Sequence, residues 1–340
     1  MEDGIIYFRT TLGHKSSYAD TLTWLTRFEI RQAKRSLSLI FDLVASRQVI
    51  FSTLDDDYLL FFLISALRRL AAKSTIGLFL RPQTCFGTKR PIQIVKRTAF
   101  RIIRSLKIAD VLVIVPFEVA PHYAEIASDW VHDPEFWDLD IKVGGPNLPS
   151  TPLAENIVIS ANGRKVICLP GTVLRRKGLS MITRILETDR DAASRILFVC
   201  AGRVPEAEQE EVDRLEMLGG LVIPRMISDQ ELFSLYRVAD IIWAAYAPEY
   251  DQSSGIFGRA LQTGCPVAVR HGSLLERMAL SEKVPYVSID FNAPEVALKA
   301  LNSALAKESL ATRQVDIAGN LARRQRFVEK ITPNRKAERK

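Results

Sequence analysis

The stretch PEYDQSSGIFGRALQTGCPVAVRHG, residues 248–272, follows an apolar run, Asp240–Ala247, that is typical of a buried strand. The Ser-Ser-Gly sequence at 253–255 would place hydroxyl and amide donors at the opening of the next helix. A helix N-terminus favours an anion, because its first N–H groups lack partners within the helix and its dipole is positive there. Gly-Cys-Pro at 264–266 then ends this helix and starts another strand. The stretch predicts a phosphate-binding turn at the end of a strand.

The same alternation of apolar strands and helical runs continues through most of the chain. Nearly continuous β-branched strands are typical of a parallel sheet that is buried on both faces. The run Ser228-Asp-Gln-Glu231 is a capping box and predicts a helix start. The predicted strands are 48–54, 74–80, 109–117, 165–172, 195–202, 221–226, 240–247, 266–271 and 286–289, with a first strand at IIYF near the N-terminus.

Glycines and prolines interrupt this alternation at 144–156, which we interpret as a linker. A length of 340 residues also favours two domains, since single cores stop growing near roughly 250–300 residues. We therefore predict two doubly wound, Rossmann-like α/β domains facing a cleft. They would span 1–150 and 151–325, followed by a basic tail, 326–340.

The composition is that of an ordinary soluble globular protein, with 47% hydrophobic and 25% charged residues. The four cysteines lie far apart without a C-x-x-C pair, so we expect reduced thiols, no zinc or other metal site, and a cytoplasmic location. The N-terminus lacks the pattern of a signal peptide. The most apolar run, Tyr58–Leu67, is too short to span a membrane and predicts a buried helix.

The net charge of +7 is concentrated in residues 89–107, which hold seven basic residues and no acidic one. Apolar residues recur there at helical spacing, while Arg97, Arg101 and Arg104 share another face. This face is either a solvated outer surface or an attraction site for anionic lipid headgroups, which would make the protein peripheral at the inner face of the plasma membrane. Nucleic acid is not expected, because no recognition motif accompanies the charge.

Ligands of doubly wound folds bind beyond the carboxyl ends of the strands, so the residues after each strand are the candidates. Gly171 follows the strand 165–172 closely enough to bring backbone near a ligand, and Arg175 to Lys177 add cations before the next helix. They would neutralise a diphosphate, or they form a surface turn with solvated charges. Arg203 follows the next strand in the same way, after Gly202.

In the second half of the chain, residues 160 to 290 resemble the nucleotide-sugar-binding domain of GT-B glycosyltransferases, particularly the retaining family four. Lys177-Gly178 resembles the family's lysine–glycine pair, and the sequence from Arg259-Ala260 to Pro266-Val267 resembles the end of its E-x7-E loop and helix. The resemblance implies that Lys177, with Arg175 or Arg176 in place of the usual upstream arginine, binds the donor diphosphate.

The family's two glutamates fall on Asp251 and Arg259. In the family the first lies near the transferred sugar, and the second accepts hydrogen bonds from the ribose hydroxyls. Asp251 keeps the acid, whereas arginine has only donors, so Arg259 would contact phosphate or pair with a nearby acid. The predicted donor-binding residues are Gly171, Arg175, Lys177, Arg203, Ser253, Ser254, Gly255 and Arg259.

The first half resembles an acceptor domain more loosely. His14, in the loop after the first strand, is either an acceptor contact or a structural histidine. His132 either faces the cleft or caps a turn beside Asp133, and we favour the turn. Asp251 and His14 are the catalytic candidates.

The resemblance implies a hexosyltransferase-type glycosyltransferase (EC 2.4) that moves a sugar from a nucleoside diphosphate-sugar to a glycan or lipid-linked acceptor, with retention, in polysaccharide or glycolipid biosynthesis. It would use neither a metal nor a cofactor, because cations and a helix N-terminus stabilise the departing diphosphate. The alternative is a non-catalytic binding or scaffold protein with the same fold, and a third option is a sugar-nucleotide epimerase.

Overall fold

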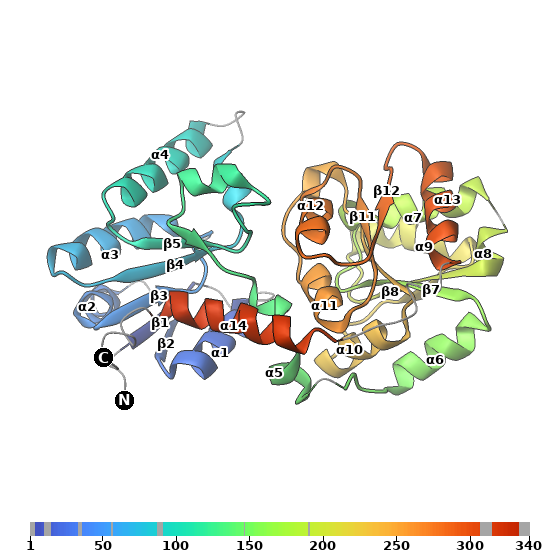
Figure 1. The fold of residues 1–340 in the computed structure, drawn as a ribbon, viewed down its shortest axis with the longest axis horizontal. Helices are drawn as coiled ribbons and strands as arrows, with labels where there is room; N and C mark the ends of the chain where they lie inside the picture. The colour runs from blue at the N-terminus through green and yellow to red at the C-terminus, as the bar shows by residue number, and fades with distance from the viewer. Residues whose placement is uncertain are drawn as a thin grey trace. The chain divides into compact units, whose positions relative to one another are not determined.

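A computed structural model of the chain describes residues 4–9, 15–32, 36–55, 57–86, 91–145, 147–189, 191–306 and 315–332. The chain divides into two compact units (Figure 1). Unit 1 takes the chain up to Pro134 and again from Ala322, and unit 2 is Glu135–Leu321. Each unit contains a six-stranded sheet in which neighbouring strands are parallel. Two Rossmann-like α/β domains are therefore confirmed.

The sheet of unit 1 has the strand order β2-β1-β3-β4-β5-β6. Its central strands are buried apolar runs, as strands covered on both faces require. The predicted strands 48–54, 74–80 and 109–117 contain β3, β4 and β5, whereas the short edge strands β2 and β6 were not predicted. The strands are β1 (Gly4–Phe8), β2 (Glu29–Gln32), β3 (Gln48–Phe51), β4 (Thr75–Phe79), β5 (Asp110–Val113) and β6 (Asp129–Trp130); the helices are α1 (Lys15–Thr26), α2 (Leu37–Ala45), α3 (Tyr58–Leu70), η1 (Pro82–Cys85), α4 (Pro91–Ser105), η2 (Pro121–Glu125), η3 (Pro134–Phe136) and α14 (Ile317–Ile331).

A buried arginine joins the helices of unit 1. Arg68, on α3, is fully buried, and its guanidinium donates to backbone carbonyls. Nη1 donates to Leu43 O and Ser46 O at 2.7 Å, and Nη2 donates to Ser74 O at 2.6 Å. Burial lowers the pKa of Arg68 to about 10, so the side chain keeps its charge at neutral pH. Arg68 thereby satisfies the carbonyls at the end of α2 and in the loop before β4.

The sheet of unit 2 has the strand order β12-β11-β10-β7-β8-β9, and all six strands lie within the predicted ranges. The chain begins at β7 and adds β8 and β9 on one side, then returns to add β10, β11 and β12 on the other. The order therefore reverses between β7 and β10, and this switch point is where open α/β sheets bind ligands. The elements are α5 (Leu139–Val143), α6 (Pro152–Ala161), β7 (Lys165–Pro170), η4 (Arg175–Lys177), α7 (Leu179–Thr188), α8 (Ala192–Arg195), β8 (Ile196–Ala201), η5 (Glu206–Glu208), α9 (Gln209–Met217), β9 (Leu221–Ile223), α10 (Asp229–Val238), β10 (Ile241–Ala244), η6 (Pro248–Tyr250), α11 (Gly255–Thr263), β11 (Val267–Arg270), α12 (Leu274–Ser281), β12 (Tyr286–Ile289) and α13 (Pro294–Leu305).

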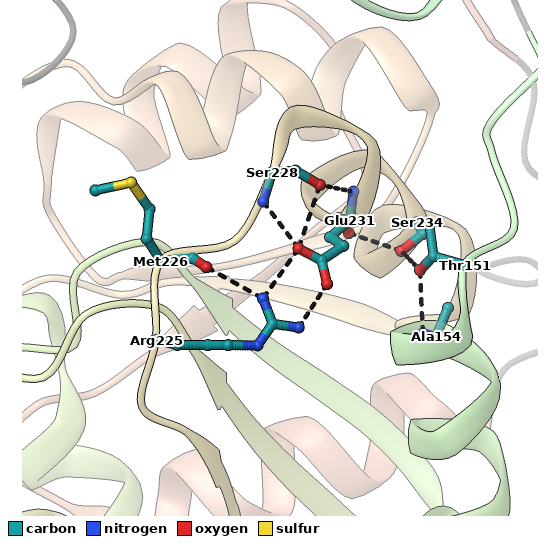
Figure 2. Close-up of polar contacts among 7 residues, drawn as sticks. All are labelled: Thr151, Ala154, Arg225, Met226, Ser228, Glu231 and Ser234. Carbon is teal, nitrogen blue, oxygen red and sulfur yellow. Dashed lines mark hydrogen bonds and ion pairs between the residues drawn. The ribbon is translucent and has the colours of Figure 1, made fainter.

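Polar side chains fix the start of α10, which packs on α6 and β7 (Figure 2). The predicted capping box is confirmed: Ser228 Oγ accepts from Glu231 N, and the Glu231 carboxylate accepts from Ser228 N. Arg225 adds an ion pair of 2.5 Å to Glu231. On the next turn, the Ser234 hydroxyl lies 2.7 Å from that of Thr151, the N-cap of α6. These contacts hold α10 and α6 together beneath the sheet.

The division between the units differs from the predicted boundary at 150/151. The chain enters unit 2 at Glu135, because α5 packs on α10 before the glycine- and proline-rich segment is reached. The chain leaves unit 2 within α14, which continues to Ile331. Residues 326–331 are thus helical and are not part of a tail, because Phe327 and Ile331 are buried and Gln48 Nε2 donates to Ile331 O at 2.6 Å.

Two helices of unit 1 bear on the membrane predictions. The run Tyr58–Leu67 lies in α3, as expected, although only one side of that helix is buried. In α4 the arginines turn toward the protein: Arg97 and Arg101 pair with Glu125, and Arg104 Nε donates to Ala127 O at 3.0 Å. Along the described residues, no helix has both the length and the apolar character that a bilayer span requires.

Candidate functional site

The loops that follow β7 and β10 meet at the switch point of the unit 2 sheet. Gly171 comes directly after β7 with a left-handed φ of 87°, and its N–H donates to Ala201 O at 2.8 Å. A Cβ on Gly171 would lie 3.6 Å from Lys177 Nζ and 3.7 Å from Ile256 Cδ1. The structure therefore brings Gly171, Lys177 and the first turn of α11 together, as the sequence predicted.

Residues at the end of β10 and just after it restrict the backbone of the Lys177-Gly178 pair. Gly178 has a φ of 97°, and a Cβ there would overlap the Ala245 carbonyl and the Trp243 indole. Only glycine fits this position, so the turn that presents Lys177 is fixed. Lys177 is half-buried, and burial lowers its pKa to about 8; the Glu135 carboxylate partly opposes this shift and Arg176 adds to it. An anion beside Lys177 would restore its full charge.

Serine residues form the entrance to α11, although their roles differ. Ser254 is the N-cap: its hydroxyl accepts from Phe257 N at 3.4 Å and lies 2.7 Å from the Tyr246 hydroxyl. Ser253 Oγ is buried, and the structure gives it no hydrogen-bond partner. The Ser253 hydroxyl is therefore a donor that is available at this turn. We call Gly171, Lys177 and the 253–255 turn the β7–β10 site.

A carboxylate from the start of unit 2 reaches this site. A Cβ on Gly255 would overlap the Glu135 carboxylate, and a Cβ on Gly258 would overlap the Phe136 ring and lie 2.8 Å from Glu135 O. Two glycines one turn apart on α11 thus allow the segment 135–136 to pack directly on the helix. Sequence reasoning gave Glu135 no role at this site, because nothing local in the sequence connects it to α11.

Arg259 lies on the same face of α11 and is 5% exposed. Its Nη1 lies 3.2 Å from Glu135 Oε1, and its Nη2 lies 3.0 Å from Asp138 Oδ2. Gln262, one turn further, donates to Glu135 O at 2.8 Å and to Asp138 Oδ1 at 2.9 Å. Of the two expectations for Arg259, pairing with nearby acids is the one that the structure contains.

The arginine and the two carboxylates of this cluster stabilise each other's charged forms. Burial opposes the charge of Arg259, but the Glu135 and Asp138 carboxylates raise its pKa well above the usual range. Burial raises the pKa of Asp138, and Arg259 opposes that rise. The guanidinium also lies over the Phe233 ring, 5.5 Å from its centroid. The two terminal nitrogens of Arg259, Nη1 and Nη2, are thus engaged within unit 2.

Asp251 lies between the β10 loop and α12. Its Oδ1 accepts from Leu274 N at 2.9 Å, which satisfies a donor at the start of α12, and lies 3.2 Å from Arg270 Nη2. Arg270 in turn donates to Tyr246 O at 3.0 Å, the carbonyl next to the β7–β10 site. Asp251 therefore stands in the same loop cluster, and the two contacts use one of its two oxygens.

The two arginine side chains of η4 contact different elements. Arg175 lies 3.5–3.7 Å from Glu208, Glu210 and Glu211, so it faces η5 and α9. Arg176 lies over the Tyr250 ring of η6 at 4.8 Å. Of the two arginines that the sequence left open, Arg176 is the one beside the β10 loop. Arg203 is exposed after β8, with its carbonyl accepting from Val173 N.

The histidine candidates belong to unit 1. His14 lies outside the described residues. His132 is buried with its ring edge-on to Trp130, at 5.1 Å between centroids.

The four cysteines are buried, and none of them forms a disulfide. Burial raises the pKa of Cys85 to about 11 and that of Cys200 to about 12, so both are neutral thiols at physiological pH. Among the residues that the structure describes, no cluster of three or more His, Cys, Asp and Glu side chains is placed to hold a metal ion. The chemistry beside Lys177 is that of cations, hydroxyls and backbone amides.

Comparison with known proteins identifies which known fold the chain has. No protein-family model matches the sequence, and no curated protein is significantly similar to it. Solved structures are similar, however. Anabaena Alr3699/HepE, determined with UDP and glucose, aligns over 99% of both chains at 12% identity and a TM-score of 0.61. A putative UDP-N-acetylglucosamine 2-epimerase from Listeria monocytogenes aligns over 99% of this chain and 98% of its own, at 12% identity and a TM-score of 0.60.

A third similar structure is an α,α-trehalose-phosphate synthase (UDP-forming) from Burkholderia vietnamiensis. It aligns over 86% of this chain and 69% of its own, at 13% identity and a TM-score of 0.52. The two parallel sheets and the switch point at β7 and β10 agree with these similarities. The chain therefore has the GT-B fold.

Proposed function

We propose that this protein is a glycosyltransferase that uses a nucleoside diphosphate-sugar donor. The observation that carries the proposal is the position of Lys177, which lies beside Gly171 and the first turn of α11 at the switch point of the sheet. A half-buried lysine with a lowered pKa and an unpartnered serine hydroxyl at the start of α11 together suit a diphosphate. The similar structure of Anabaena Alr3699/HepE was determined with UDP and glucose, which makes UDP the first ligand to test.

In the proposed reaction, the bond between the anomeric carbon and the donor phosphate oxygen breaks, and the acceptor hydroxyl oxygen bonds to that carbon. The acceptor proton leaves with the diphosphate, whose growing negative charge Lys177, Arg176 and the α11 amides stabilise. Asp251 stabilises positive charge at the anomeric carbon. This arrangement requires neither a metal nor a cofactor, and the configuration would be retained.

The proposed acceptor is a glycan or a lipid-linked sugar, and the proposed setting is polysaccharide or glycolipid synthesis in the cytoplasm. A lipid-linked acceptor would bring the enzyme to the inner face of the membrane. The basic residues of 89–107 support attraction to anionic lipid, although Arg97 and Arg101 share Glu125 as a partner.

Release of nucleoside diphosphate from a panel of donors, with and without acceptors, tests the proposal. Lys177→Ala should abolish turnover, whereas Lys165→Ala, an exposed lysine at the start of β7, should leave it unchanged. Near-normal turnover in Lys177→Ala would contradict the assignment of Lys177 to the donor site. Turnover of donor sugar without any acceptor would favour an epimerase.

A second candidate is a binding or scaffold protein with this fold. The observation that favours it is Arg259, because an arginine held by Glu135 and Asp138 has no acceptor to offer a ribose. Calorimetric titration with UDP and other nucleoside diphosphates separates the two: the enzyme binds one of them, and the scaffold binds none.

A further inference from the structure

Large apolar side chains are concentrated on the outside of three helices of unit 1. Of the twenty large apolar side chains exposed among the described residues, eleven lie on α2, α3, α4 or the residue just after α4. Such side chains present roughly 100 Å² each, so together they offer on the order of 1,000 Å², whereas a stable interface buries about 800 Å² per partner. We call these residues the α2–α4 face: Leu37, Phe41, Leu59, Leu63, Leu67, Leu70, Ile92, Ile94, Val95, Ile102 and Leu106.

The outward side of α3 has the repeat of a helix that packs along another helix. Four exposed residues follow one another at spacings of four, three and four residues, and we call them the α3 seam: Leu59, Leu63, Ala66 and Leu70. This is the spacing of the a and d positions of a coiled coil. The small Ala66 in the middle of the seam allows a second helix to approach closely. The opposite side of α3 supplies the core with Phe61 and Ile64, both fully buried, so the seam has no role in the core of its own unit.

The outer surface of α4 carries a second repeat of the same kind. Its residues follow one another at spacings of three, four, three and four, and we call them the α4 seam: Ile92, Val95, Ala99, Ile102 and Leu106. Leu106 lies one residue beyond α4, and its N–H donates to Ile102 O at 3.0 Å, so the helical turn continues to the end of the seam. An alanine again lies in the middle. Two helices of one unit thus present the same alternation of large and small apolar side chains.

The three helices form one layer with α3 in its middle. The Phe62 and Phe100 rings join α3 to α4 with centroids 4.9 Å apart, and Arg68 joins α3 to α2 through the Leu43 carbonyl. The crossovers β2–α2–β3, β3–α3–β4 and β4–α4–β5 all proceed in the same direction along the sheet. Right-handed crossovers therefore place all three helices on one side of it, and Figure 1 shows them in succession.

The cations of α3 and α4 lie off the two seams. The arginines of α4 share the flank opposite its seam and are engaged with Glu125 and the Ala127 carbonyl, next to the edge strand β6. The α4 seam is therefore on the flank toward α3. On α3 the charged residues are Arg68, which is buried, and Arg69 near the helix end. Two copies of the seams would meet without like charges between them, and the seams offer no charge that would select a charged partner.

We propose that the α2–α4 face is the interface of a homodimer in which α3 of one copy packs against α3 of the other. A two-fold interface brings the same patch of both copies together, and the middle helix of that patch faces its own copy. The two Ala66 residues then lie near the two-fold axis, and the leucines of each α3 seam pack between those of the other. Helices that lie on a membrane surface instead carry cations beside their apolar side, and here those cations point elsewhere. This inference concerns unit 1 alone and is independent of the activity proposed for unit 2.

Analytical ultracentrifugation of the full chain at several protein concentrations tests the proposal. The test variant is Leu59→Glu/Val95→Glu, which changes one residue of each seam at 68% and 63% exposure. Its matched control is Val158→Glu/Ile159→Glu on α6 of unit 2, at 55% and 74% exposure.

The wild type and the α6 control should be dimers at micromolar concentration, and salt should not dissociate them because apolar contacts are not screened. The test variant should dimerise at least about a hundredfold more weakly, because its carboxylates would be buried without partners.

Cysteine cross-linking tests the pairing of α3 with its own copy while leaving both seams otherwise intact. The four native cysteines are buried, so an introduced surface cysteine is the thiol that a short bismaleimide reaches first. Ala66→Cys should yield a covalent dimer, because the two thiols face each other near the axis. Ile159→Cys, exposed on α6, should remain monomeric in denaturing electrophoresis.

Three results would overturn the proposal. The first is a wild type that stays monomeric, and flotation of that monomer with phosphatidylcholine vesicles would assign the face to a bilayer instead. The second is a dimer that Leu59→Glu/Val95→Glu leaves unweakened, because the interface would then lie elsewhere. The third is cross-linking of Ile159→Cys to the same extent as Ala66→Cys, which would contradict the pairing of the two α3 helices.

Discussion

Arg259 on α11 and Glu135 at the start of unit 2 form a buried ion pair, with 3.2 Å between Nη1 and Oε1. This pair occupies the helix position where the resembled family has a ribose-binding glutamate. The position is therefore charge-reversed, and the compensating acids come from a distant segment of the same unit. The pair explains why the departure at residue 259 is compatible with the fold.

Arg259→Met should destabilise unit 2 severely. The change leaves Glu135 and Asp138 buried beside each other without a cation, and breaking a buried pair in this way costs about 3–5 kcal/mol. The measurement is the free energy of unfolding by denaturant titration. The control is Arg225→Met, whose pair with Glu231 is exposed and should cost below about 1 kcal/mol. Equal losses in the two variants would mean that the buried cluster is not held by Arg259.

Gly258→Ala should also destabilise unit 2. A Cβ at this position meets the Phe136 ring and the Glu135 carbonyl, so the 135–136 segment must move and we expect a loss of about 1–3 kcal/mol. Gly145→Ala is the control, because a Cβ there has no neighbour within 4 Å. Thermal unfolding compares the two, and an unchanged Tm for Gly258→Ala would contradict the packing described.

Arg68→Met should destabilise unit 1. It removes the guanidinium donors to the carbonyls of Leu43, Ser46 and Ser74, and each buried carbonyl left unsatisfied costs about 1–3 kcal/mol. Arg69→Met, the exposed neighbour, should be nearly neutral. The expected ranking is read from chemical denaturation, and the two variants must separate clearly for Arg68 to have this role.

The stability of unit 2 should depend on Lys177 at high pH. Burial lowers the pKa of Lys177 in the folded chain from 10.5 to about 8, so between these values the unfolded chain binds a proton that the folded chain lacks. The free energy of unfolding therefore increases between about pH 8 and about pH 10.5. This increase should be absent in Lys177→Met and present in Lys165→Met, as measured by denaturant titration at several pH values. The reverse result would mean that a group other than Lys177 causes the increase.

Affinity for UDP should fall above pH 8 if the proposed donor site is correct. The diphosphate binds the protonated form of Lys177, so affinity declines by up to about tenfold per pH unit once the lysine titrates. Calorimetry in buffers with different ionisation enthalpies should show proton uptake near pH 8. In Lys177→Arg the uptake should vanish, because arginine stays charged; uptake that survives this change would exclude Lys177 as its source.

Much of the fold follows from the sequence because the signals are local. The apolar runs predicted all six strands of unit 2, and the Ser228–Glu231 pair predicted the start of α10. Gly264 predicted the end of α11, and the structure has it there with a left-handed φ of 65°. The edge strands β2 and β6 were missed because one is polar and the other has two residues.

The candidate site was predictable only in part, because its charges are paired through space. The side chain of Arg175 was assigned to a diphosphate, whereas three acids near η5 and α9 hold it, and Arg176 lies beside η6 instead. Nothing local in the sequence connects Glu135 to Arg259.

The glycines at 255 and 258 and the cluster at 135, 138 and 259 also set a rule for sequence change. A glutamate returned to position 259 would face two carboxylates, so it is tolerated only if positions 135 and 138 change as well. A side chain at 255 or 258 is tolerated only if the 135–136 segment moves. Among relatives of this protein these positions should therefore vary as a group, and a chain that carries Arg259 should carry acids and glycines at the matching positions.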